Sequence, residues 1–223
     1  MRQGTINNYI KFSKSFGGVR KCYEGKPTIA VGGFMCEPEL MPAYPNVMAA
    51  GTLVYADESA EGRSIVPIYT FKVLSVDTET REVTVEKYET GSIAKVGMKL
   101  LVVGDDLTQA VSNIATVTAV DTSNDGYDIL TMDEVVADSD AFIVAGDVLA
   151  EAKSSTVKKI KAIPNGLTYC DNVLDPDAYA IDIDYIWNCM EKPVLERRMP
   201  PLTASLKKAL RDNECYFRFS NRK

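Results

Sequence analysis

The sequence predicts a mainly β protein, a β-barrel or sandwich built from duplicated hairpins. The first observation is a near-repeat about 44 residues apart, in which residues 71–78 (FKVLSVDT) are echoed by residues 115–122 (ATVTAVDT). The second is that each copy passes through a polar turn into an alternating segment and then reaches a glycine followed by apolar residues, at Gly97 and Gly146. The third is the density of Val, Ile, Thr and Tyr, which suit a pleated, half-buried surface.

Residues 51–152 are predicted to form the barrel domain. Asp77 starts a polar turn in the first copy, and the Asp125–Gly126 pair is a strong turn signal in the second. Each turn joins two segments of alternating polarity, so each copy contains a hairpin. The expected strands are residues 53–55, 65–76, 82–88, 98–103, 114–120, 127–132, 141–144 and 148–150.

Residues 1–50 are predicted to form an extended N-terminal arm and linker. The first part shows neither a strand nor a helix period, and its Tyr9, Phe12 and Phe16 are aromatics of the kind that lie on a partner chain. The same composition also fits a disordered tail. Three prolines in residues 34–50 argue against a regular helix or a central strand there.

Residues 153–223 are predicted to form a C-terminal strand and helix segment. Residues 179–187 alternate as a strand with one wet, acidic face, and the only tryptophan in the chain, at its end, is expected to be buried. After two prolines, leucines recur at helical spacing behind Thr203, an N-cap residue, which predicts a helix over 203–211. Residues 215–219 suit a final edge strand.

Composition excludes several classes of chemistry. The chain has no histidine, so catalytic triads and zinc sites that need this residue are impossible. Its five cysteines are scattered without a CxxC pair, which favours free and mostly buried thiols. Asp182 and Asp184 are expected to face water on a strand rather than to bind a cation. No phosphate-binding or nucleophile motif occurs in a suitable context, so we expect no enzyme, no cofactor and no metal.

The formal net charge of −6 hides a strong polarity. Residues 1–27 carry six Lys and Arg against one acid, residues 191–223 carry nine against four, and residues 28–190 carry 10 against 26. Basic ends can bind nucleic acid, dock on an acidic neighbour or simply be solvated. The acidic centre would repel phosphate, so we expect no nucleic-acid partner. No apolar run approaches the roughly 20 residues that span a bilayer, and no signal-peptide core is present, so we expect cytoplasmic assembly without a membrane partner.

The most distinctive local motif is the pair Arg197–Arg198 before two prolines. Guanidinium groups are good interface anchors because they are weakly hydrated and form bidentate pairs, although the same pair also suits a salt bridge within the chain. With the apolar face of the following helix, Leu202, Leu206 and Leu210, these residues form the predicted interface. The aromatic residues of the arm complete it.

A family resemblance rests on four segments of the second half. They are residues 145–149 (AGDVL), 164–167 (PNGL), 179–182 (YAID) and 194–201 (VLERRMPP), the last followed by the short predicted helix. Together they resemble head fiber and capsid-decoration proteins of tailed phages, which are often encoded in prophages of gut bacteria. The resemblance implies a structural protein of the virion, carried on the capsid exterior, commonly as a homotrimer, with the phage major capsid protein as partner. It implies no catalytic residue.

Two alternatives stay open from the residues alone. A carbohydrate- or ligand-binding β-module would need an exposed aromatic platform, for which the candidates are Tyr55, Tyr69, Tyr88, Tyr127 and Trp187. A hydrolase with a carboxylate pair is the third hypothesis, because such pairs meet only in three dimensions.

Overall fold

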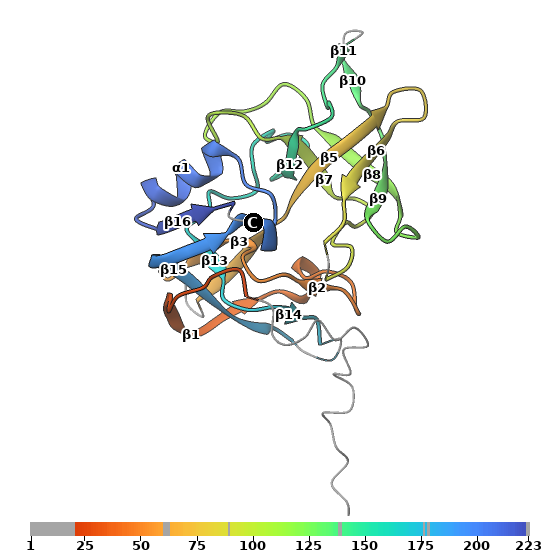
Figure 1. The fold of residues 1–223 in the computed structure, drawn as a ribbon. Coiled ribbons are helices and arrows are strands. Elements are labelled where there is room, and N and C mark those ends of the chain that lie inside the picture. Colours follow the sequence, from red (N-terminus) through yellow and green to blue (C-terminus); the bar gives the residue numbers. More distant parts are fainter. Residues whose placement is uncertain are drawn as a thin grey trace, which may run out of the picture.

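Six strands close into a β-barrel, and a second sheet packs beside it (Figure 1). The computed structural model describes residues 21–59, 63–88, 90–137, 140–175, 177 and 179–221. The predicted arm contacts of Tyr9, Phe12 and Phe16 lie outside the described residues. The barrel strands are β5 (Thr70–Asp77), β6 (Glu82–Glu86), β7 (Lys99–Val102), β8 (Ala115–Asp121), β9 (Tyr127–Met132) and β12 (Val148–Glu151).

The barrel confirms the predicted duplication and adds an exchange of strands. Its order is β12-β5-β6-β9-β8-β7, with β12 also paired to β7. Each copy forms its own hairpin, β5–β6 or β8–β9, but its third strand pairs with the first strand of the other copy. The barrel therefore has an approximate internal twofold axis, and neither copy can pair all of its strands alone.

The two copies match down to single hydrogen bonds. The bulge between Val73 and Ser75 recurs between Val117 and Ala119. Gly97 N donates to Val117 O at 2.8 Å, and Gly146 N donates to Val73 O at 2.9 Å. Both glycines have positive φ, +88° and +95°, a conformation that L side chains rarely adopt. Gly97 and Gly146, which occupy equivalent places in the two repeats, thus form the turn that leads into each third strand.

Replacing either glycine by alanine should cost the same free energy of unfolding, about 1–2 kcal/mol. An added Cβ has open space at Gly97 and at Gly146, so the cost comes from the backbone conformation alone. Urea denaturation of Gly97→Ala and Gly146→Ala measures it. Gly104→Ala is the control, because Gly104 also has open space but no positive φ and should lose nothing. Clearly unequal losses would contradict the equivalence of the two turns.

The second sheet draws strands from all three predicted segments. Its order is β1-β4-β3-β13-β15-β16, and β1 also pairs with β15. Its strands therefore do not follow the predicted boundaries after residues 50 and 152. The strands are β1 (Thr28–Cys36), β3 (Leu53–Asp57), β4 (Ser64–Ile68), β13 (Gly166–Thr168), β15 (Ile181–Leu195) and β16 (Tyr216–Ser220).

Two expectations about this sheet need correction. Residues 28–36, expected in the arm and linker, form β1, because a register shift between Ala30 and Phe34 takes the intervening glycines out of the ladder. Trp187, expected to be buried, is 38% exposed. Thr28 pairs with Asn188 and Ile29 with Ile186, so a second shift leaves the tryptophan without a cross-strand partner on β1.

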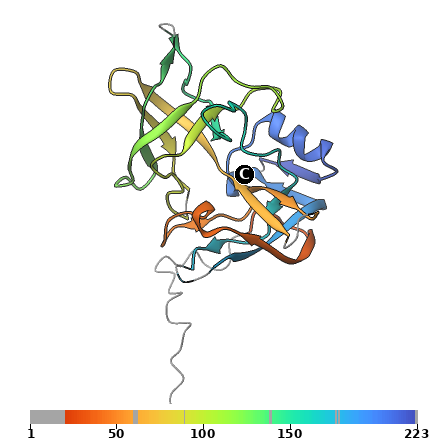
Figure 2. The same ribbon diagram turned by 180° about the vertical axis from the view of Figure 1, so that it is seen from behind.

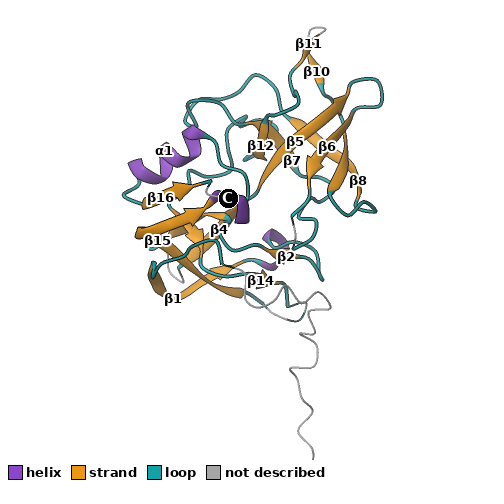
Figure 3. Ribbon diagram, viewed as in Figure 1, coloured by secondary structure: helices purple, strands orange, loops and turns teal. Residues whose placement is uncertain are grey.

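Barrel and sheet share two hydrophobic cores. One contains the barrel interior together with Phe34, Val54 and Ile183 of the sheet. The other joins barrel residues such as Leu101 to the sheet and to α1 (Ala204–Asp212), the only α-helix in the described part of the chain (Figure 3). Smaller elements complete the fold: 3-10 turns at Pro38–Leu40 and Glu196–Arg198, the pair β2 (Val47–Met48) with β14 (Asn172–Val173), and the hairpin β10 (Val136–Ala137) with β11 (Asp140–Ala141).

Candidate functional site

A cleft of about 490 Å³ opens between the barrel and the C-terminal segment. It lies where the ends of β5, β6 and β12 meet the 3-10 turn before α1. The barrel side and the C-terminal side are joined nearby, since Thr70 Oγ1 donates to Pro201 O at 2.8 Å. The lining residues include Lys72, Glu86, Lys87, Tyr88 and Val148 from the barrel, and Glu196, Arg197, Met199, Pro201, Leu202 and Asn221 from the C-terminal segment.

The 3-10 turn sends the two predicted arginines in different directions. Arg197 is exposed and lines the cleft. Arg198 is half-buried, and its guanidinium donates to Lys21 O at 3.5 Å, which is a weak contact to the N-terminal side. Of the pair, Arg197 is therefore the residue placed to meet a partner, and Leu202 lies with it in the cleft.

The charges in the cleft are only partly satisfied by the protein itself. Lys87 Nζ lies 3.3 Å from Asp128 Oδ1, and Glu196 Oε2 lies 2.7 Å from Lys207 Nζ. Among the described residues, Lys72, Arg197 and Glu86 form no ion pair; two of these three are cations. The cleft is thus a partly apolar depression with a small excess of positive charge.

Leu206 and Leu210 are not available to a partner, which corrects their predicted role. They are 0% and 1% exposed, and both belong to the core that α1 shares with the sheet. Thr203 caps the helix as predicted, with its hydroxyl accepting from Leu206 N at 3.3 Å. The helical spacing of the leucines predicts a covered face correctly, but that face packs on the chain's own strands.

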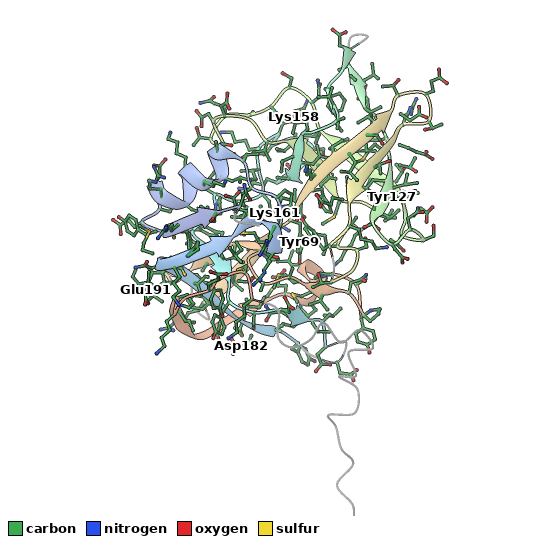
Figure 4. The ribbon with its side chains drawn as sticks, in the orientation of Figure 1. Tyr69, Tyr127, Lys158, Lys161, Asp182 and Glu191 are labelled. Atoms are coloured by element: carbon green, nitrogen blue, oxygen red, sulfur yellow. The ribbon has the colours of Figure 1, made fainter. Side chains whose placement is uncertain are left out.

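The aromatic candidates for a ligand platform do not share one surface. Tyr69 is 1% exposed and its hydroxyl donates to Leu40 O at 2.7 Å, while the Tyr88 hydroxyl donates to Thr70 O. Tyr127 lies on the outer side of the barrel, far from the central Tyr69 (Figure 4). Tyr55 and Trp187, both 38% exposed, stand on strands β3 and β15.

The thiols are poorly suited to nucleophilic chemistry. Burial raises the pKa of the Cys36 thiol to about 12 and that of Cys215 to about 11, so both stay protonated at neutral pH. Burial also raises the pKa of Cys170 and Cys189. The five cysteines form no disulfide, and four of them are buried, as the sequence predicts.

Acidic residues do not gather into a cation site in the described part of the chain, where no group of three or more potential ligands was found. Burial, followed by the neighbouring Asp182, raises the pKa of Asp184. Asp182 is exposed, which agrees with the wet face expected for this strand. Among the described helices, none is long and apolar enough to cross a membrane.

Lys72 and Lys87 are not distinctive in the sequence, because neither stands in a motif. Val85 pairs with Val73 and Met132 pairs with the equivalent Val117, so Lys87 is equivalent to Glu134 and Asp128 is equivalent to Arg81. Charged residues therefore occupy these positions in both repeats, with the signs reversed.

Comparison with family models, with curated proteins and with solved structures found no match to this chain.

Proposed function

We propose that this chain is a non-enzymatic structural protein of a bacteriophage or prophage virion, attached to the capsid exterior as a head fiber or decoration protein. It acts as a homo-oligomer, a homotrimer in keeping with the sequence resemblance, and binds the major capsid protein. The observation that carries the proposal is the position of Arg197, which belongs to the basic C-terminal segment and is exposed in the lining of the cleft.

The packed interior of the barrel supports a structural role rather than the binding of a ligand inside the barrel. Its interior is filled by side chains that are at most 2% exposed, among them Val73, Val85, Leu100 and Leu130. A barrel packed in this way supplies rigidity and an outer surface for binding. The acidic barrel and the basic C-terminal segment give the molecule two surfaces of opposite charge, which favour oriented association.

Arg197→Ala should weaken capsid binding about tenfold or more, because arginines at the centre of an interface are common hot spots. The measurement is co-sedimentation with capsids assembled from the major capsid protein of the same genome. Arg198→Ala is the matched control and should have a smaller effect, since its guanidinium already contacts Lys21 O. Absence of wild-type co-sedimentation at micromolar concentrations would reject the capsid assignment.

A further inference from the structure

The β10–β11 hairpin is an addition to the barrel, not a part of it. It stands out from the barrel end away from the C-terminus (Figures 1 and 2). β10 and β11 pair only with each other. At the corresponding place between β6 and β7, the described residues of the first repeat form only the single bridge Tyr88–Gly91, yet this half of the barrel closes equally well. The hairpin is therefore dispensable for closure and free to contact another molecule.

The hairpin is acidic, whereas the cleft has a small excess of positive charge. Glu134 and Asp140 are exposed on or beside the hairpin, and residues 70–151 as a whole carry 16 acids against five Lys and Arg. Lys72 and Arg197 supply the positive charge in the cleft, whereas Glu86 is its one acid without an ion-pair partner among the described residues. The basic N-terminal residues 1–27 are a poor electrostatic match for this cleft.

A molecule cannot place this hairpin in its own cleft. Glu82 starts β6 beside the end of β9, from which the hairpin follows, whereas Glu86 and Lys87 reach the cleft at the other end. Five residues of strand separate the two ends by about 16 Å. The acidic projection and the cationic cleft thus point to different neighbours.

We propose that the β10–β11 hairpin of one copy docks in the cleft of a second copy, with Glu134 and Asp140 facing Lys72 and Arg197. The contact is heterologous, because the two surfaces differ, and such contacts build rings or filaments. The inference rests on the proposed structural role. It assigns the cleft, and with it Arg197, to a second copy, so Arg197→Ala would weaken capsid binding through loss of the oligomer and its multivalent attachment.

Light scattering across dilution and salt series tests the contact with the full chain. The wild type should exceed 24.5 kDa, with a mass that falls as salt rises. A cleft variant, Lys72→Glu with Arg197→Glu, and a hairpin variant, Glu134→Lys with Asp140→Lys, should each associate at least about tenfold more weakly. A chain that carries all four substitutions should associate again, because both charges are reversed.

The matched control is Lys153→Glu with Lys159→Glu, which makes the same change in net charge at two exposed lysines outside the cleft lining. It should keep the wild-type mass. A wild type that stays monomeric at the highest concentrations, or a fourfold variant that fails to recover while retaining its circular dichroism spectrum, overturns the contact. A monomer that still co-sediments with capsids would assign the cleft to the capsid protein and leave the proposed function standing.

Discussion

Lys87→Met is expected to lower the free energy of unfolding by about 3–5 kcal/mol, because it breaks a buried ion pair from one side. Asp128 is only 3% exposed, and its Oδ1 atom has the Lys87 ammonium at 3.3 Å but no hydrogen bond. Removing the lysine leaves a buried carboxylate without its counter-charge. The ammonium also donates to Thr122 O and Asn124 O, at 2.6 and 2.7 Å, so the turn of the second hairpin loses its anchor.

A double variant supplies the control for this experiment. Lys87→Met with Asp128→Val removes both charges of the pair and puts apolar side chains in their place. Replacing a buried ion pair by packed apolar residues is often neutral or stabilising, so the double variant should recover most of the loss. Chemical denaturation of the wild type, both single variants and the double variant gives the coupling energy. A double variant that is less stable than Lys87→Met would show that the loss does not come from the unpaired Asp128 carboxylate.

Leu206→Ala should lower the free energy of unfolding by about 2–5 kcal/mol, since it leaves a cavity in a core that collapses only partially. The side chain is fully buried among residues from the sheet, the barrel and the N-terminal side, including Cys22 and Leu101. Thermal denaturation measures the loss. The helix therefore stabilises the fold by packing against the sheet, the barrel and the N-terminal side.

Leu202→Ala is the companion variant, because Leu202 is only half-buried and lines the cleft. It should cost less stability than Leu206→Ala but weaken association. The reverse pattern, in which Leu206→Ala keeps its stability and loses self-association, would return Leu206 to the interface predicted from sequence.

Features with a clear local period could be predicted from the sequence. The hairpins alternate with a period of two, and α1 combines a capping Thr203 with leucines at helical spacing. β1 could not be predicted in the same way, because Gly32–Gly33 breaks its alternation and the strand is completed only by a distant partner, β15. The exposure of Trp187 could not be predicted either, because a register shift in the ladder leaves no mark on residue type.

The candidate site was predictable only in part. Arg197 could be chosen because guanidinium is a versatile interface group, but Lys72 lies far away in the chain and joins it only through the fold. A leucine stripe shows that a helix face will be covered, not which surface will cover it. For Leu206 and Leu210 that surface is the chain's own sheet and barrel.

The exchange of third strands has a consequence for how such a molecule can be made. β5 can pair with β12 only after the second repeat has been synthesised. Until then, backbone N–H and C=O groups at the strand edges of the first repeat have no hydrogen-bond partner within that repeat. The same geometry means that two separate chains, each a single repeat, contain every pairing that the barrel uses. A twofold dimer of single repeats would therefore contain the same strand pairings as this barrel, and joining two repeats in one chain turns an association between molecules into a fold within one.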